Sequence, residues 1–231
     1  MKLPLSSRLL ACCGFVRPGD VVADIGCDHG YLGIHLLKQG IAKAVIAADV
    51  NEQPLQSAVR NAMRYGVKNK MSFYLSDGVR NIPRDFSVMV CAGMGADTMI
   101  QILEAAPWLR DERYRLILQC QSRRPELRRW LYDHGFRICR ETLAQDGKFI
   151  YPIMEIIFSP AEPLTPGGWH ISPALLASGS PLLPDFLRRV KGGIRTTVEG
   201  LRHSGSDKLP EFEAILAELT EMEGTIHAHR S

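Results

Sequence analysis

The chain has 231 residues, of which 45% are hydrophobic and 23% are charged, and its net charge at pH 7 is only +3. This composition excludes a disordered or fibrous chain, and the length leaves room for one sizeable α/β domain and a small additional unit. No apolar run approaches the roughly 18 residues that a membrane-spanning helix needs, so we expect no membrane partner.

Strand and helix patterns alternate along the chain to about residue 158. The predicted strands cover 21–25, 44–48, 71–75, 87–91 and 115–119, and the predicted helices cover 29–39, 52–65, 96–105 and 125–134. Two further strands, 136–144 and 149–158, are joined directly by a turn at 145–148. Repeated β-α units predict a parallel sheet with helices on both faces, into which this closing hairpin inserts one antiparallel strand.

The composition changes after Ser159. Residues 160–184 are rich in proline and are expected to form a linker. Apolar residues then recur at helical spacing on both sides of Ser204-Gly205-Ser206, which predicts a coiled-coil-like α-helical hairpin. We therefore predict an α/β domain at 1–159, a linker at 160–184 and a helical hairpin domain at 185–231. The strand order favours the Rossmann-like seven-stranded sheet of methyltransferases over a dehydrogenase, in which β-α-β units continue.

The cysteines indicate a reducing compartment. The sequence contains six, at positions 12, 13, 27, 91, 120 and 139, without a C-x-x-C pair or a spacing typical of zinc ligands. We therefore expect free thiols and no metal site. Residues 1–16 are interrupted by Pro4 and Arg8 and do not resemble a signal peptide. These features predict a cytoplasmic location.

Glycine or acidic residues end four consecutive predicted strands. Ligands of open α/β sheets bind at the carboxyl ends of the strands, so this recurrence predicts a cofactor site there. Tight turns also favour glycine and aspartate. A turn could explain these residues at any one strand end, but it is a poor explanation for all four strand ends together. The residues expected to contact the cofactor are Asp24, Gly26, Gly30, Asp49, Val50, Asp77, Gly78, Ala92, Gly93 and Met94.

Charge at the first of these turns selects the kind of cofactor. A dinucleotide fingerprint, G-x-G-x-x-G, places glycines against a pyrophosphate. Here Asp28 stands between Gly26 and Gly30, and its carboxylate would repel a pyrophosphate. S-adenosylmethionine carries a sulfonium and an ammonium group and no phosphate, so Asp24 and Asp28 suit it. Asp49 can accept hydrogen bonds from both ribose hydroxyls.

These motifs resemble the bacterial tRNA adenine-N1 methyltransferases that act on adenosine 22. That family shows Asp-Ile-Gly-x-Asp-His-Ala-Tyr-Leu-Pro where this sequence has residues 24–33, and Ala-Gly-Met-Gly-Gly where it has 92–96. Ile-Leu-Gln-Pro-Asn and an Arg-x-Trp-Leu helix correspond to 117–121 and 128–131. The resemblance covers roughly residues 5–158 and, more loosely, the helical tail, which is similar to the family's C-terminal coiled-coil domain.

The sequence departs from the family pattern at a few positions. Gly30 and Gly33 replace alanine and proline, and Ala96 replaces glycine. Cys120-Gln121 replaces Pro-Asn in what we expect to be the pocket for the target base.

The resemblance implies methyl transfer to N1 of an adenosine in tRNA. Because N1 has an in-plane lone pair, the enzyme mainly has to align the reactants and exclude water. The methylated base is cationic, so a nearby carboxylate would stabilise it and could accept a proton from the exocyclic amine. We expect Asp28 in this role, assisted by His29 and Tyr31. The alternatives are that Asp28 caps the following helix, that His29 is structural, and that Tyr31 packs in the core rather than stacking on a base.

Arginine is concentrated in two segments of this nearly neutral chain. One lies within 110–140 and the other on the first predicted helix of the tail, while the second tail helix is acidic. Segregated arginine suits contact with a phosphate backbone, and solvated helix faces with ion pairs between the tail helices are the alternative. The residues expected to bind RNA are Arg123, Arg124, Arg128, Arg129, Arg188, Arg189 and Arg195.

Three other functions compete with this interpretation. The chain could methylate another RNA or a small molecule, or it could be a non-catalytic RNA-binding protein of the same fold. A nicotinamide oxidoreductase is disfavoured by Asp28. The sequence leaves the oligomeric state open.

Overall fold

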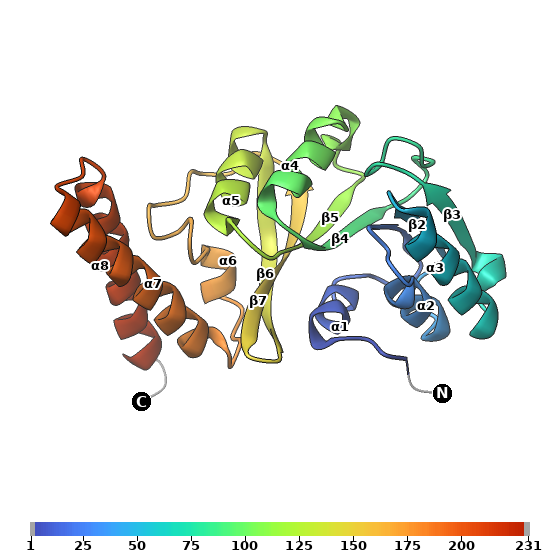
Figure 1. Ribbon diagram of the computed structural model, residues 1–231, viewed down its shortest axis with the longest axis horizontal. Helices are drawn as coiled ribbons and strands as arrows, with labels where there is room; N and C mark the ends of the chain where they lie inside the picture. The colour runs from blue at the N-terminus through green and yellow to red at the C-terminus, as the bar shows by residue number, and fades with distance from the viewer. Residues whose placement is uncertain (1–2, 229–231) are drawn as a thin grey trace.

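Seven strands form one sheet in the order β3-β2-β1-β4-β5-β7-β6 in the computed structural model, which describes residues 3–228 (Figure 1). The first five strands are parallel, and β7 runs antiparallel to both of its neighbours. This arrangement confirms the predicted fold class. The strands are β1 (Val21–Ile25), β2 (Ala44–Asp49), β3 (Met71–Leu75), β4 (Val88–Met94), β5 (Arg115–Cys120), β6 (Phe136–Asp146) and β7 (Phe149–Phe158).

Helices cover both faces of the sheet and form the C-terminal hairpin. The helices are α1 (Ser7–Cys13), α2 (Tyr31–Lys38), α3 (Glu52–Arg64), α4 (Ala96–Glu104), α5 (Arg124–Asp133), α6 (Pro173–Leu176), α7 (Leu183–Ser204) and α8 (Leu209–Ala228), with short 3-10 helices η1 (Lys68–Lys70) and η2 (Pro107–Leu109). Helix α1 and the short helix α6 were not predicted from the sequence. Within residues 3–228 no helix combines the length and the apolar character needed to cross a bilayer.

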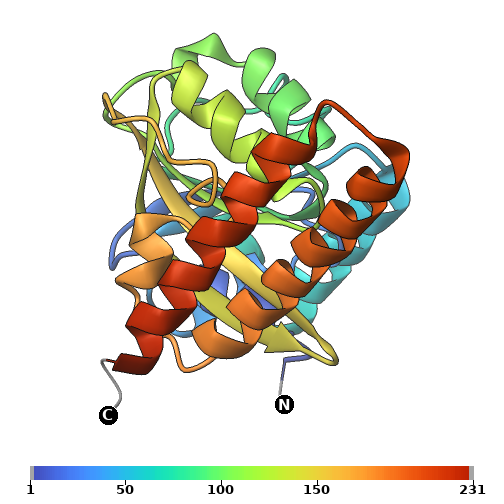
Figure 2. The same ribbon diagram turned by 90° about the vertical axis from the view of Figure 1, so that its left-hand side faces the viewer.

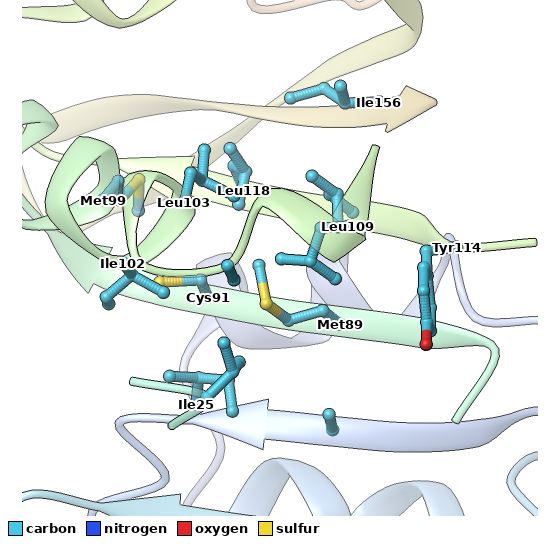
Figure 3. Close-up of a cluster of buried hydrophobic side chains, with 14 of the residues drawn as sticks. Ile25, Met89, Cys91, Met99, Ile102, Leu103, Leu109, Tyr114, Leu118 and Ile156 are labelled. Carbon is cyan, nitrogen blue, oxygen red and sulfur yellow. The ribbon is translucent and has the colours of Figure 1, made fainter. Parts of the chain in front are cut away.

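Two apolar cores hold the helices on the sheet. On one face, α4, η2 and α5 pack on β4, β5 and β7, and Figure 3 shows Met99, Leu103 and Leu109 facing Met89 and Leu118. On the other face, α1, α2 and α3 pack on the opposite side of the same sheet. Because the core strands are covered on both faces, they are apolar almost throughout, as expected of a parallel sheet.

The tail packs on the β6–β7 hairpin. Helices α7 and α8 lie side by side (Figure 2), and their apolar faces share one core with Leu143 of β6 and Ile150 of β7. Residues 160–184, expected to be a linker, contribute Ile171 and Leu175 to that core. Ion pairs also connect the tail helices, between Lys191 and Glu223 and between Arg202 and Glu213.

Candidate cofactor and active site

A cavity of about 260 Å³ opens at the carboxyl ends of β1 and β4, where the sequence predicts the cofactor. Five of its lining residues come from the predicted cofactor set and three from the predicted catalytic set. The lining residues are Arg8, Leu9, Asp24, Gly26, Cys27, Asp28, His29, Tyr31, Leu32, Ala92, Gly93 and Met94. The cavity is therefore formed by the end of β1 and the turn after it, the start of α2, the end of β4 and the helix α1.

Asp24 supplies a buried carboxylate to this cavity. Its side chain stands near the end of β1 and is 5% exposed, and its Oδ2 has no hydrogen-bond partner within the described part of the chain. Burial raises the pKa of this carboxyl to about 7, the Asp49 carboxylate adds to the rise, and the backbone N–H of Gly33 opposes it. Leaving a buried polar atom unpaired costs free energy, so a ligand that donates a hydrogen bond or a positive charge here would be favoured.

Glycine is required by geometry at two turns of the cavity. Gly26 and Gly93 have φ angles of +70° and +87°, in the left-handed region that favours glycine. A Cβ atom on Gly26 would lie 2.3 Å from Cε of Met94, and one on Gly93 would lie 3.0 Å from Nη1 of Arg8. The backbone can therefore approach a ligand at these turns, which a side chain would obstruct.

Asp49, at the end of β2, connects the second strand to the turn that follows β1. Its Oδ2 accepts a hydrogen bond from the backbone N–H of Asp28 at 3.1 Å, and its Oδ1 accepts one from the N–H of Asn51 at 2.9 Å. Each carboxylate oxygen can accept about two hydrogen bonds. Asp49 thus positions the Asp28 turn and keeps acceptor capacity for a further donor.

Asp28 does not cap the helix that follows it. Helix α2 begins at Tyr31 with Gly30 as its N-cap, and no side chain caps it. Asp28 instead adopts a left-handed backbone conformation with a φ of 50°, which is uncommon for a residue other than glycine. Its carboxylate is 69% exposed at the cavity and lies 3.6 Å from Nε2 of His29. The Asp28 side chain is therefore accessible to a substrate.

His29 and Tyr31 complete this wall of the cavity. Their ring centroids are 5.9 Å apart, and the side chain of His29 is 51% exposed. The backbone carbonyl of His29 accepts a hydrogen bond from Nδ2 of Asn61 on α3. The three residues predicted to be catalytic therefore lie together.

The remaining predicted cofactor residues lie outside the cavity lining. Val50 is 62% exposed beside Asp49, and Gly30 lies against Ala58 of α3. Asp77 lines a separate cavity of about 410 Å³, between β3 and α4, and pairs with Arg80 at 3.4 Å. The neighbouring Gly78 lies against Ile102 of α4.

Arg8 is a site residue that sequence reasoning missed. It extends from α1 over Gly93, donates a hydrogen bond to Oε1 of Gln119 at 3.0 Å and lies 3.6 Å from the carboxylate of Asp146. Gln119, at the end of β5, is fully buried, and its Nε2 has no partner within the described residues. Arg8 therefore brings a cation into a cavity lined by carboxylates.

The structure corrects the expectation that Arg128 binds RNA. Its side chain is fully buried and forms an ion pair with Glu141 of β6. It also donates hydrogen bonds to the carbonyl oxygens of Trp169 and His170, both at 3.0 Å. Arg128 therefore holds the segment before α6 on the sheet. Its position in the sequence gives no sign of the distant Glu141 that neutralises it.

The other predicted RNA contacts are accessible to different degrees. Arg123 pairs with Asp97 and Glu126 at the start of α5. The guanidinium of Arg124 lies 5.2 Å from the ring centroid of Phe186 on α7, and burial lowers its pKa. Arg129 pairs with Glu211 of the tail helix α8. The members of the set on α7, Arg188, Arg189 and Arg195, are all exposed.

Comparisons with known proteins agree with this geometry. Residues 5–154 match the methyltransferase domain family. The tRNA (adenine(22)-N(1))-methyltransferase of Bacillus subtilis is 33% identical over 149 residues, which are 64% of this chain and 63% of that protein. The matched part also spans only 61% of a curated relative from Mycoplasma genitalium.

Solved structures extend the similarity to the tail. A Streptococcus pneumoniae structure, described as a candidate tRNA (m1A22) methyltransferase in complex with S-adenosyl-L-methionine, is 32% identical with a TM-score of 0.80, over 92% of this chain and 99% of that chain. A Streptococcus agalactiae protein of the NADB-Rossmann superfamily has a TM-score of 0.86 at 25% identity, over 96% of this chain and 99% of that chain.

The strand order and the acid-lined cavity at the carboxyl edge define the class of Rossmann-like methyltransferases. Within that class the chain belongs to the family of tRNA (adenine(22)-N(1))-methyltransferases. The predicted resemblance is thereby confirmed.

Proposed function

We propose that this chain transfers the methyl group of S-adenosylmethionine to N1 of an adenosine in tRNA, at position 22 as in the B. subtilis relative. The proposal is carried by the buried Oδ2 of Asp24 in the cavity after β1. This oxygen has no hydrogen-bond partner among residues 3–228. The S. pneumoniae relative, described as bound to S-adenosyl-L-methionine, supports it. We expect the protein to act in the cytoplasm.

The residues of the site fit this cofactor by charge and by shape. Oδ2 of Asp24 suits the ammonium group, because it meets no donor in the described chain. The remaining acceptor capacity of Asp49 suits the ribose hydroxyls, and the guanidinium of Arg8 suits the carboxylate of the methionine part. The turns at Gly26 and Gly93 allow close approach of the backbone. The bound cofactor would supply a methyl group on a positively charged sulfur, which is a good leaving group.

Asp28 is placed to assist the transfer. The adenine ring gains positive charge as N1 is methylated, and a carboxylate within reach lowers the free energy of that charge. The same carboxylate can accept a proton from the exocyclic amine. Asp49 holds the backbone of Asp28 in place, while His29 and Tyr31 flank it. Asp28 thus acts on the substrate, and Asp49 positions it.

Arginine side chains on α5 and α7 suit the phosphates of a large RNA. Exposed arginines bind phosphate backbones mainly through charge, with little dependence on sequence. With Arg128 assigned to the interior, the proposed contacts are the exposed Arg123, Arg129, Arg188, Arg189 and Arg195 and the partly buried Arg124. The ion pairs between α7 and α8 involve Lys191 and Arg202, so the arginines proposed on α7 are not needed for those pairs.

Mapping the modified nucleotide tests the proposal. The protein is incubated with an unmodified tRNA transcript and S-adenosylmethionine carrying a labelled methyl group, and the RNA is digested and analysed by mass spectrometry. We expect N1-methyladenosine at position 22 and no label in a transcript that carries guanine at that position. Label in another base, or none in RNA, would contradict the proposed activity.

A further inference from the structure

The tip of the β6–β7 hairpin presents aromatic side chains to solvent. Phe149, the first residue of β7, is 53% exposed. Tyr151 follows two residues later, on the same face of the strand, and the two ring centroids are 6.1 Å apart. Ile150 between them points to the other face and is buried in the core shared with the tail. One face of the tip is therefore anchored, and the other carries an aromatic pair of which Phe149 is exposed and Tyr151 is partly buried.

This exposed face continues the wall of the candidate site. Asp146 pairs with Phe149 across the hairpin and lies on the same face. Its carboxylate is 3.6 Å from Nε of Arg8, which lines the proposed cofactor cavity. Figure 1 shows the hairpin tip between α1 and α7. The face that carries Phe149 is therefore connected to the cavity through Asp146 and Arg8.

The surroundings of the aromatic pair are mainly cationic. Nζ of Lys148 lies 5.3 Å from the ring centroid of Phe149. From α7, Arg189 donates a hydrogen bond to the carbonyl oxygen of Lys148 at 2.6 Å, and it shares the carboxylate of Asp185 with Arg188. Together with Arg8, these cations outnumber the carboxylates of Asp146 and Asp185 that accompany them. This charge complements an anionic partner.

The tip is held in place before any partner binds. Arg8 contacts it from α1 and Arg189 contacts it from α7. Within the turn, Nε2 of Gln145 donates to the carbonyl oxygen of Gly147 at 3.2 Å. Binding to a surface that is already ordered costs less conformational entropy than binding to a mobile loop.

We propose that Phe149, supported by Tyr151, is a stacking platform for an unpaired nucleobase that neighbours the methylated adenosine, with Lys148 and Arg188 on the adjoining phosphates. Proteins recognise splayed RNA bases by stacking them on aromatic side chains beside basic groups. Two aromatic rings are too small a patch for a stable protein interface. This inference rests on the proposed tRNA activity and names the part of the surface that receives RNA next to the reaction.

The test compares Phe149→Ala with the control Met63→Ala, which truncates a 61% exposed side chain on α3. Affinity for an unmodified tRNA transcript is measured by fluorescence anisotropy at several salt concentrations. Removing the platform for one stacked base should weaken binding by about 5- to 100-fold. The slope of log affinity against log salt should not change, because every phosphate partner stays in place. The affinity for S-adenosylmethionine should stay parental in both variants.

Phe149→Trp provides the second readout. Indole stacks at least as well as phenyl, so this variant should keep parental tRNA affinity, and the added tryptophan emission should be quenched by tRNA. If Phe149→Ala binds tRNA with parental affinity, or if tRNA does not quench the emission of Phe149→Trp, the stacking platform is overturned. The proposed function is still supported in that case if the parent methylates adenosine in tRNA. A parent that leaves tRNA unmethylated would overturn both.

Discussion

We expect Asp24 to link cofactor binding to pH. Its folded-state pKa is raised to about 7 by burial, and only its ionised form attracts the ammonium group of S-adenosylmethionine. Below that pKa, binding has to release a proton, so the Kd should fall as pH rises, by about tenfold per unit, and level off near pH 7. Isothermal titration calorimetry at several pH values below and around pH 7 measures how the Kd depends on pH. Asp24→Asn should bind weakly with a flat profile, and a parental slope in this variant would assign the titration to another group.

Asp28 can be tested without changing the shape of its side chain. Asp28→Asn keeps the volume and the tolerance for a left-handed backbone but removes the charge. We expect the single-turnover rate of tRNA methylation to fall by about 100-fold or more, in line with removal of a general base or an electrostatic contact. Binding of S-adenosylmethionine should change little, because the hydrogen bond to Asp49 comes from the Asp28 backbone. Near-parental turnover would remove Asp28 from the reaction.

At the scale of single elements, helix α7 combines two roles on opposite faces. Its buried face, with Phe186, Leu187 and Ile194, joins the tail core. Its other face carries the arginines proposed to contact RNA. Replacing these arginines keeps the apolar core of the tail and removes one polar contact, the hydrogen bond from Arg189 to the carbonyl oxygen of Lys148.

Salt dependence measures the contribution of these arginines. We expect Arg188→Gln, Arg189→Gln and Arg195→Gln together to weaken tRNA binding and to lower the slope of log affinity against log salt, by about 0.9 for each duplex phosphate that is no longer neutralised. Arg64→Gln on α3 is the matched surface control. A slope that stays parental would place the phosphate contacts on α5 instead, with Arg123, Arg124 and Arg129.

At the scale of the whole molecule, the tail and the sheet depend on each other. Deleting residues 164–231 would expose Leu143 and Ile150 and would remove the carbonyl oxygens of Trp169 and His170 from the buried Arg128. It would also remove Ser172, whose hydroxyl donates to Glu141. Each hydrogen bond to a charged group contributes about 1.5–3 kcal/mol, so the loss of these bonds destabilises the fold.

We therefore expect the deletion to lower the midpoint of thermal unfolding sharply and to weaken cofactor binding indirectly. The triple arginine variant of α7, which keeps the apolar core, should lower that midpoint far less than the deletion does in the same calorimetric scan. A deletion variant as stable as the parent would show that these contacts across the chain contribute little.

The layout of the sheet and the position of the candidate cofactor site could be predicted from the amino-acid sequence. Periodicity is a local property, so runs such as 21–25 and 44–48 predict strands from their own residues. Parallel strands bring their carboxyl ends to one edge, so Asp24, Asp49 and Gly93 could be placed near each other without coordinates. The negative charge of the Asp28 side chain then favoured a cofactor with positively charged groups.

Which charged side chains line the cavity and which are buried in the core could not be predicted from the sequence, because packing between distant segments sets their burial. Arg8 reaches the cavity because α1 packs against β4 and β6, a contact between distant segments that no local pattern encodes. Arg128 is buried because Glu141 and two carbonyl oxygens surround it, although an arginine on a helix is ordinarily exposed. Gly30, and not Asp28, is the N-cap residue of α2, so the Asp28 carboxylate is exposed at the cavity. Each outcome depends on long-range packing, which sets burial and hence the cost of leaving a charge without a partner.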